Sequence, residues 1–432
     1  MSAPSTQPRP PASPTYILRG HASPIHGLHI FSRNLRIISG DADGWIIVWD
    51  LVFKRPVAVW KAHEGAILEV KAFSLNDGNL TEVYTHGRDH KLCVWRFRIQ
   101  DEEFLEKTLP VDVGEQQSQA SAASQTQPWL VHSLPVNALN FCAFSILFID
   151  DCEDARQTER SPAGDTTSPE NTQRSSLIAV PNALNSGSID IFTLPRERRL
   201  CTIPPDTTQQ VGMVMAVNLF YSSSGDVYVA SAYEDGHVMV FARKGPVSTS
   251  DVSWNWKWEK LYVSRPHSQP ALSIDVFSAG GYFLSSSADA LLVKHPVPEL
   301  GAFEEAPVKS VNTKHASQQG LRIRSDGKVF STAGWDSRVR VYSCKTMREL
   351  AVLKWHKEGC YAVTFAEVFA SFGSGGDTTG DEDVGKSLQI ARRENGDFSL
   401  ANVQRQRNEK VQSTHWLAAG SKDGKISLWD IY

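Results

Sequence analysis

Histidine, hydroxyl and carboxylate side chains recur along the chain in an order that could carry out nucleophilic catalysis. That chemistry needs an activated hydroxyl, a base that takes its proton and a carboxylate that orients the base. Each set also ends in an aromatic residue. The sets are His21, Ser39, Asp43 and Trp49; His63, Thr85, Asp89 and Trp95; His315, Thr332, Asp336 and Tyr342; and, with no hydroxyl in its slot, His356, Asp423 and Trp429.

The repetition of these sets indicates a structural role, because an enzyme builds one catalytic site rather than several. In such a tetrad the Asp holds the His, the His reaches the hydroxyl and the hydroxyl meets the aromatic side chain. Each buried polar group then satisfies the next. We therefore expect hydrogen-bonded tetrads that hold the fold together, and no catalytic residue.

A second stretch of sequence matches a nucleotide-binding motif. Residues 380–387 read GDEDVGKS, which fits the phosphate-loop pattern G-x-x-x-x-G-K-S. A phosphate loop follows a buried strand, opens a helix and turns its backbone N–H groups toward the anion. Here Asp381, Glu382 and Asp383 would face the phosphates, in surroundings rich in Gly, Asp and Thr. We expect a chance match in a surface loop and no cofactor; the enzyme alternative is an ATPase that uses Lys386.

The spacing within the sets predicts β-hairpins. In the complete copies the hydroxyl residue precedes the Asp by four positions, and the aromatic residue follows the Asp by six. Residues 37–50, IISGDADGWIIVWD, read as an apolar strand, an Asp-Gly turn and a second strand that ends in Trp-Asp. Seven copies are present, three of them imperfect: Ser285 and Asp289 are followed by His295, Asp423 and Trp429 have Ala419 in the hydroxyl slot, and the copy that ends in Phe192 lacks the Asp.

A Gly-His element, a strand and a hairpin ending in Trp-Asp, at a period in the forties, resemble the WD-repeat family. The resemblance implies an all-β, seven-bladed β-propeller whose four-stranded blades surround a central channel. Seven blades of about 45 residues account for roughly 315 positions. We assign residues 1–14 to a disordered tail and residues 15–432 to the propeller. Three polar stretches, at about 112–127, 150–175 and 371–412, are expected to be disordered insertions.

The two ends of the chain are predicted to pair. The last hairpin ends at residues 429–432 without an outer strand of its own. Residues 15–21, TYILRGH, have the same apolar character and the same following His as residues 56–63, PVAVWKAH, which complete the first blade. We expect the amino-terminal strand to complete the last blade, which closes the ring and removes two exposed strand edges.

One residue of each hairpin turn is a candidate for partner binding. The residue before the turn Asp is predicted to lie on one rim of the ring, beside the loop that carries the His. This column reads Ala42, Arg88, Glu234, Ala288, Trp335 and Lys422. Trp and Arg dominate binding hot spots when they are exposed. We single out Arg88, Glu234, Trp335 and Lys422 as candidate partner-binding residues; an incidental mixture of surface residues is the alternative.

A tryptophan stripe leaves two interpretations open. Trp254, Trp256 and Trp258 alternate with polar residues in SWNWKWEK, so on a strand they would share one face. We favour packing in the core or between blades. An exposed patch that binds a partner is the alternative.

Composition excludes several function classes. A net charge of −4 offers no general attraction to nucleic acid or anionic lipid, which requires clustered Lys and Arg. The amino terminus is polar and proline-rich where a signal peptide would be apolar, and no apolar run is long enough to span a membrane. The six cysteines have no paired spacing, so neither a zinc site nor a disulfide framework is expected. We expect no metal, no small-molecule substrate, no membrane and no direct nucleic-acid contact.

Several continuous segments resemble a particular WD-repeat family. They are SGDADGWIIVWD, RPVAVWKAHEGAIL, THGRDHKLCVW, PWLVHSLPVNALNFCAF, STAGWDSRVRVY and LAAGSKDGKISLW. They resemble the fungal ASTRA-associated WD-repeat proteins and their animal counterparts, the G-protein-β-subunit-like proteins. The resemblance implies a nuclear scaffold subunit of the ASTRA complex, present also in the cytoplasm, with protein partners in that complex. It further implies a link to chromatin regulation and to the co-chaperone complex that matures phosphatidylinositol-3-kinase-like kinases.

The main rival is a WD-repeat substrate receptor of a cullin ubiquitin ligase. Such receptors usually carry a Trp-Asp-x-Arg box. Here residues 95–98 read Trp-Arg-Phe-Arg, which lacks the Asp. The motif therefore favours the ASTRA-associated family over the receptor.

Overall fold

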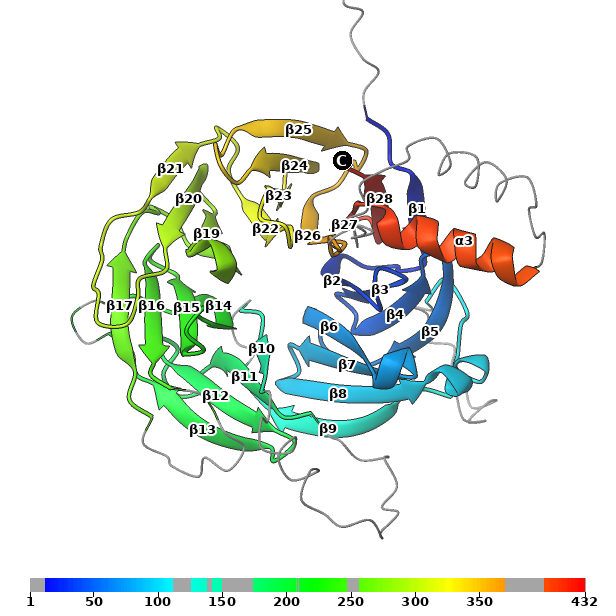
Figure 1. Cartoon of the computed structure of the whole chain (residues 1–432), viewed down its shortest axis with the longest axis horizontal. Helices are drawn as coiled ribbons and strands as arrows, with labels where there is room; N and C mark the ends of the chain where they lie inside the picture. Colours follow the sequence, from blue (N-terminus) through cyan, green and yellow to red (C-terminus); the bar gives the residue numbers. More distant parts are fainter. Residues whose placement is uncertain are drawn as a thin grey trace, which may run out of the picture.

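The chain folds into a closed ring of β-sheets. The structure, a computed structural model, describes residues 12–111, 126–137, 142–149, 174–206, 208, 210–245, 247, 256–369 and 400–431. In these ranges seven four-stranded antiparallel sheets surround a central channel (Figure 1). The predicted all-β, seven-bladed propeller is confirmed.

Six of the blades take their strands in chain order, with the first strand innermost (Figure 1). Blade 1 comprises β2 (Ile25–Phe31), β3 (Arg36–Asp41), β4 (Trp45–Asp50) and β5 (Arg55–Lys61); blade 2 comprises β6 (Ile67–Leu75), β7 (Leu80–Gly87), β8 (Lys91–Arg98) and β9 (Trp129–Pro135); blade 3 comprises β10 (Ser145–Phe148), β11 (Ser176–Pro181), β12 (Ile189–Leu194) and β13 (Arg198–Ile203). Blade 4 comprises β14 (Val214–Tyr221), β15 (Val227–Tyr233), β16 (Val238–Arg243) and β17 (Glu259–Ser264); blade 5 comprises β18 (Ala271–Phe277), β19 (Tyr282–Ser287), β20 (Leu291–Pro296) and β21 (Lys309–Asn312); blade 6 comprises β22 (Gln318–Ile323), β23 (Val329–Gly334), β24 (Arg338–Ser343) and β25 (Glu349–Lys354). Short 3-10 helices occur at η1 (Asn76–Gly78), η2 (Ile99–Glu103) and η3 (Ser278–Gly280).

The seventh blade joins the two ends of the chain. Its strands are β26 (Cys360–Phe365), β27 (Trp416–Ser421), β28 (Lys425–Asp430) and β1 (Tyr16–Arg19). β1 pairs antiparallel with β28, and the backbone N–H of Thr15 donates to the carbonyl of Leu428 at 2.7 Å. The predicted closure is confirmed. It pairs two strand edges that would otherwise stay open to aggregation.

Neighbouring blades pack face to face, and the apolar core lies between them. Ile38, Ile46 and Val48 of blade 1 share one buried cluster with Ile67 and Val70 of blade 2. Because neighbouring blades cover each other, both faces of a middle strand such as β4 are buried. This explains continuous runs such as WIIVWD, where period-two alternation with polar residues is absent.

The hairpin turns require glycine at one position. Gly44, between β3 and β4, has a φ of +87°, which L side chains rarely adopt. A Cβ at this position would lie 1.9 Å from the carbonyl oxygen of His63. The turn of blade 1 therefore packs directly on the loop that enters blade 2, and only glycine leaves room for that contact.

One expected insertion contains a helix. The stretch 371–412 was predicted to be disordered, but α3 (Leu400–Ser413) occupies its end and lies beside blade 7 (Figure 1). Val411 is buried, and its carbonyl accepts a hydrogen bond from the Trp416 indole at 3.0 Å. The Asn34 amide donates to the carbonyl of Gln412 at 3.1 Å. The prediction was wrong for the helix because the helix is anchored at its carboxyl end.

The other insertions fall mostly outside the described residues. This holds for the tail up to residue 11, for residues 112–125 and for residues 150–173. The phosphate-loop match at 380–387 also lies outside the described residues. Thr126 is described, and its carbonyl accepts a hydrogen bond from the Glu106 N–H at 3.1 Å.

Candidate partner-binding rim and central channel

The structure brings all four predicted tetrad residues of blade 2 together. His63 donates from Nδ1 to Asp89 Oδ1 at 2.8 Å, and the Thr85 hydroxyl donates to His63 Nε2 at 2.7 Å. The Trp95 indole donates to the same hydroxyl oxygen at 3.0 Å. Thr85 and His63 are buried, and burial lowers the pKa of the His63 imidazole. The hydroxyl is enclosed by its own partners, so this arrangement joins strands and offers no open nucleophile.

Blade 1 uses a different Asp from the predicted one. His21 donates to Asp41 Oδ2 at 2.7 Å, and Asp43 instead accepts a hydrogen bond from the Ser23 hydroxyl. Ser39 and Trp49 complete this tetrad as predicted, with the Trp49 indole 2.9 Å from Ser39 Oγ. The spacing rule selected Asp43, and that assignment was wrong. The DAD sequence offers two carboxylates, and the Asp that ends β3 points at the imidazole.

Blade 6 contains no histidine tetrad. His315 is exposed, and the Thr332 hydroxyl donates instead to Gln318 Oε1, which also accepts from the Tyr342 hydroxyl at 3.4 Å. Asp336 pairs with Arg340 at 2.6 Å. The assignment of His315 and Asp336 to a tetrad was therefore wrong.

The position of the inner strand explains this difference. In the other histidine-containing blades the inner strand begins four residues after the His, but β22 begins only three residues after His315. The histidine is thus one position out of register. Gln318, at the start of β22, supplies the acceptor that the imidazole supplies elsewhere.

Blade 7 obtains its hydroxyl from the neighbouring strand. The Ser427 hydroxyl donates to His356 Nε2 at 2.9 Å and accepts from the Trp429 indole at 2.9 Å. His356 Nδ1 lies 3.4 Å from Asp423. Ser427 stands directly opposite Ala419, the empty hydroxyl slot, in the register of β27 and β28. A cross-strand neighbour has therefore replaced the missing hydroxyl group.

Blade 5 extends the network through a second histidine. His267 donates to Asp289 at 3.2 Å and accepts from Ser285 at 2.8 Å. His295 replaces the usual tryptophan: its Nε2 donates to Ser285, and its Nδ1 accepts from the Tyr262 hydroxyl, each at 2.8 Å. The His295 imidazole thus supplies the hydrogen-bond donor that a tryptophan indole supplies in other blades.

Each residue of the rim column lies beside the loop that enters the inner strand of its own blade. In six blades the backbone N–H of the rim residue donates to a carbonyl of that loop, at 2.8 to 3.1 Å. The six pairs are Ala42 with Pro24, Arg88 with Ala66, Glu234 with Met213, Ala288 with Pro270, Trp335 with Ser317 and Lys422 with Gly359. Arg88, Glu234, Trp335 and Lys422 are exposed. Trp335 keeps 51% of its surface exposed while its indole donates to Gln319 Oε1 at 2.7 Å.

A ring of bulged residues lies next to this rim. Six inner strands carry a β-bulge directly after their first residue, and a bulge re-aims the side chain of the extra residue. The bulged residues, which all line the central channel, are His26, Leu68, Met215, Leu272, Gln319 and Tyr361. The His26 and Tyr361 rings stack with centroids 5.3 Å apart. We call these six residues the entrance ring.

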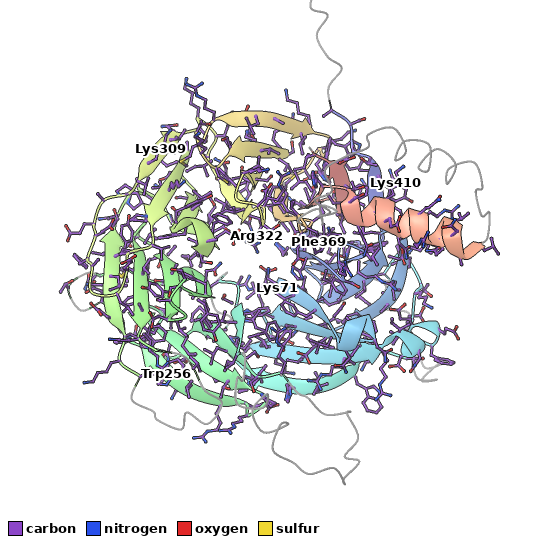
Figure 2. The ribbon with its side chains drawn as sticks, in the orientation of Figure 1. Lys71, Trp256, Lys309, Arg322, Phe369 and Lys410 are labelled. Carbon is purple, nitrogen blue, oxygen red and sulfur yellow. The ribbon has the colours of Figure 1, made fainter. Side chains whose placement is uncertain are left out.

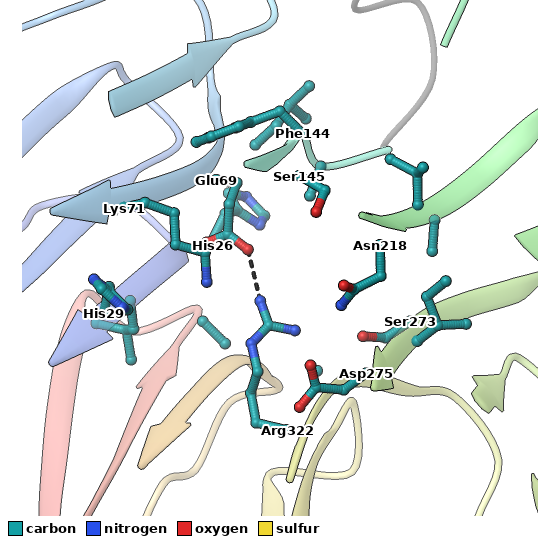
Figure 3. Close-up of a pocket in the computed structure, with 18 of the residues that line it drawn as sticks. His26, His29, Glu69, Lys71, Phe144, Ser145, Asn218, Ser273, Asp275 and Arg322 are labelled. Atoms are coloured by element: carbon teal, nitrogen blue, oxygen red, sulfur yellow. Dashed lines mark hydrogen bonds and ion pairs between the residues drawn. The ribbon is translucent and has the colours of Figure 1, made fainter. Parts of the chain in front are cut away.

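Charged residues line the channel below the entrance ring. The channel has a volume of about 350 Å³, and Lys71 and Arg322 point into it from opposite sides (Figures 2 and 3). Arg322 Nη2 lies 2.6 Å from Glu69 Oε2. Burial raises the pKa of the Asp275 carboxyl and lowers the pKa of the Lys71 ammonium.

The entrance ring was not predicted from the sequence, although a signal for part of it exists. In the blades that keep the repeat histidine, the bulged residue stands five positions after it: His26 after His21, Leu68 after His63, Leu272 after His267 and Tyr361 after His356. These four bulged residues have no residue type in common. Only their position, five residues after the repeat histidine, marks them in the sequence. The predicted rim column is therefore only one part of the surface at the channel mouth, and the entrance ring is the other part.

The tryptophan stripe packs inward where it is described. Trp256 is buried, Trp258 packs against the same cluster, and their rings lie 6.1 Å apart. The Arg243 guanidinium lies 4.0 Å from the centre of the Trp256 ring. Trp254 lies outside the described residues.

The described ranges contain neither a metal-binding cluster nor a membrane-spanning helix. No group of three or more His, Cys, Asp or Glu side chains there is arranged to hold a metal ion. None of the described helices has the length and apolar character that crossing a bilayer requires. The free cysteines of this part of the chain are Cys93, Cys142, Cys201, Cys344 and Cys360.

Comparison with known proteins identifies the family. The family model described as ASTRA-associated protein 1 matches residues 14–429. The chain is 72% identical over 443 residues to ASTRA-associated protein 1 of Aspergillus flavus and 64% identical over 450 residues to that of Aspergillus niger, with 100% of each chain covered. It is 31% identical over 377 residues to the Schizosaccharomyces pombe protein of the same name, covering 82% of this chain and 93% of the relative. The chain therefore belongs to the ASTRA-associated protein 1 family.

Proposed function

We propose that the chain is a non-catalytic scaffold subunit of the ASTRA complex, which it contacts through the rim and the entrance ring. The observation that carries the proposal is the full-length match to relatives named ASTRA-associated protein 1. Their name states an association, and identity of 72% over the whole chain supports the same association here.

The chemistry of the described residues favours binding over catalysis. The histidine, hydroxyl and carboxylate groups that could form a catalytic triad are used in inter-strand hydrogen bonds, as in His63 with Thr85 and Asp89. The rim, in contrast, exposes a large aromatic side chain, Trp335, whose indole is already oriented by Gln319. Rigid, exposed aromatic residues are typical of binding hot spots.

The proposal has a finer part, which rests on the family resemblance. The protein would act in the nucleus, with the cytoplasm as a second location. There it would take part in chromatin regulation and in the assembly or stability of phosphatidylinositol-3-kinase-like kinases through their co-chaperone complex. A rigid ring with several faces suits such a role, because each face can hold a different partner.

Affinity purification of the tagged full-length chain from its source cells tests the proposal. Mass spectrometry of the eluate should identify ASTRA complex subunits and the kinase co-chaperones. Recovery of a cullin adaptor without these proteins would contradict the proposal and favour the ubiquitin-ligase receptor. Fluorescence imaging of the tagged chain in the same cells tests the nuclear location.

A further inference from the structure

The outer strand of blade 2 is a sheet edge without charged residues. β9 is the last strand of its sheet, and within the described ranges no other strand pairs with its outer side (Figure 1). Its sequence, WLVHSLP, contains no Asp, Glu, Lys or Arg. A sheet edge presents backbone N–H and C=O groups that the sheet itself does not pair. An apolar, uncharged edge is therefore a template for another strand.

The other six outer strands are protected against such pairing. Two are covered by segments of the same chain: the N–H of Val59 in β5 donates to the carbonyl of Glu106 at 2.8 Å, and the N–H of Glu304 donates to the carbonyl of Leu261 in β17 at 2.9 Å. All six also contain charged residues, which oppose pairing at an edge. These are Arg19 of β1, Arg55 and Lys61 of β5, Arg198 and Arg199 of β13, Glu259 and Lys260 of β17, Lys309 of β21, and Glu349 and Lys354 of β25. Among the described residues, β9 has neither protection.

Exposed apolar side chains lie on this edge. Trp129 keeps 83% of its surface exposed, and Leu130 keeps 52%. Trp129 and Val131 line a groove of about 680 Å³, whose floor includes Leu80 and Phe97. Exposed apolar patches of this kind mark interaction sites on protein surfaces.

The absence of charge favours a second copy of the chain as the occupant of the edge. A strand that pairs with its own copy meets its own sequence across a two-fold axis, so it cannot select opposite charges on its partner. A strand of another protein can match charges on the edge, and it therefore does not require an uncharged one. Of the seven outer strands, β9 is the one whose pairing with itself brings no Asp, Glu, Lys or Arg into the contact.

The apolar patch is also complementary to itself. Antiparallel pairing about a two-fold axis at Leu130 places Trp129 of each copy opposite Val131 of the other, and facing residues lie on the same side of a sheet. Because Trp129 and Val131 both line the groove, each Trp129 ring then lies over the groove of the other copy. A Trp side chain buries about 150–250 Å², whereas each partner of a standard interface buries about 800 Å². We therefore expect a weak dimer that dissociates on dilution.

We infer that β9 pairs with β9 of a second copy of the chain, which joins two four-stranded blades into one continuous sheet. This homodimer goes beyond the proposed scaffold function and does not depend on it. The pairing uses the outer strand of blade 2, whereas Trp335 of the rim belongs to blade 6. The dimer would thus present the rim and the entrance ring twice.

Sedimentation equilibrium of the purified full-length chain, over a series of concentrations, tests the inference. The wild type should form a species of twice the 47.8 kDa chain mass as the concentration rises. Leu130→Lys places a charge on the edge and should weaken the dimer about ten-fold or more. Leu350→Lys is the matched control, because Leu350 is likewise the second residue of an outer strand, β25, and is 50% exposed. It should dimerise as the wild type does.

Trp129→Ala provides a second test that adds no charge. It should also weaken the dimer about ten-fold or more, the effect of losing a hot-spot aromatic residue. At a dilution where the chain is monomeric, the Tm of all three variants should equal that of the wild type, since the substituted side chains are exposed. This control separates a lost contact from a lost fold.

Three results would overturn the inference. The first is a wild type that stays monomeric at about 100 µM, which would leave the edge to a strand of another protein. The second is a dimer that a folded Leu130→Lys or Trp129→Ala leaves intact. The third is an equal loss of the dimer with Leu350→Lys. Because the dimer is measured on the purified chain, failure to recover ASTRA subunits would refute the proposed function alone.

Discussion

Arg322 of β22 reaches into the channel and places its Nη2 2.6 Å from Oε2 of Glu69 on β6, so blades 2 and 6 are joined across the ring (Figure 3). The Glu69 side chain is buried and the Arg322 side chain keeps 26% of its surface exposed. No backbone pairing links these two strands. The ion pair therefore connects two inner strands that are not neighbours in the ring.

Arg322→Met should destabilise the fold, because it leaves the Glu69 carboxylate buried without its charged partner. We expect a loss of roughly 1–3 kcal/mol in the free energy of unfolding. Urea unfolding of the full-length chain measures it. Glu69→Gln in the same chain should recover part of the loss, since the uncompensated charge is then gone. Additive losses in the double variant would show that the two groups do not interact.

Asp41→Ala and Asp43→Ala should differ, although the two residues stand two positions apart. Asp41 is fully buried and accepts from His21 and from the N–H groups of Asp43 and Trp45. Its loss should cost roughly 1–3 kcal/mol. Asp43 contacts the Ser23 hydroxyl near the surface, so Asp43→Ala should stay within about 0.5 kcal/mol of the wild type. Equal unfolding midpoints for the two variants would refute the corrected tetrad.

Ser427→Ala should destabilise blade 7 by about 1 kcal/mol, because the His356 and Trp429 side chains both lose their partner. Adding Ala419→Ser places a hydroxyl in the slot directly opposite. The double variant should regain much of the lost stability, as measured by thermal unfolding. If Ala419→Ser brings no gain in the Ser427→Ala background, the two positions are not interchangeable.

Acid should destabilise the protein through its buried histidines. Burial, with His63 as a nearby charge, lowers the pKa of His86 from 6.5 to about 3. Between these values the unfolded chain binds the proton and the folded chain does not, so stability falls as the pH falls through this window. The loss for one histidine is about 1.4 kcal/mol per pH unit. The free energy of unfolding of His86→Leu should therefore fall less steeply than that of the wild type, by about 2 kcal/mol between pH 7.5 and 5. Parallel pH profiles for the two chains would contradict the shift.

Blade number and ring closure could be predicted from the sequence because they depend on spacing. A hydroxyl, an Asp and an aromatic residue at fixed offsets mark each hairpin, and the strand before His21 matches the one before His63. The identity of each tetrad partner depends on where side-chain atoms lie. Gln318 and Ser427 supply the needed group from positions that the spacing rule does not examine.

The helix and the channel could not be predicted for different reasons. α3 is polar along most of its length and buries only Val411 among its described residues, so no apolar periodicity marks it. The entrance ring depends on a β-bulge, which no residue type announces. The pairing of Glu69 with Arg322 depends on ring closure, since 253 residues separate them.

We propose that the rim beside the channel binds the partner. It is tested most directly by measuring partner recovery with Trp335→Ala and with Trp129→Ala, a control at an even more exposed tryptophan on the outer strand of blade 2. At unchanged Tm, Trp335→Ala should lower recovery about 30-fold, the effect of losing about 2 kcal/mol at a hot spot, and Trp129→Ala should leave it unchanged. Full recovery with Trp335→Ala, or loss only with Trp129→Ala, would contradict the claim.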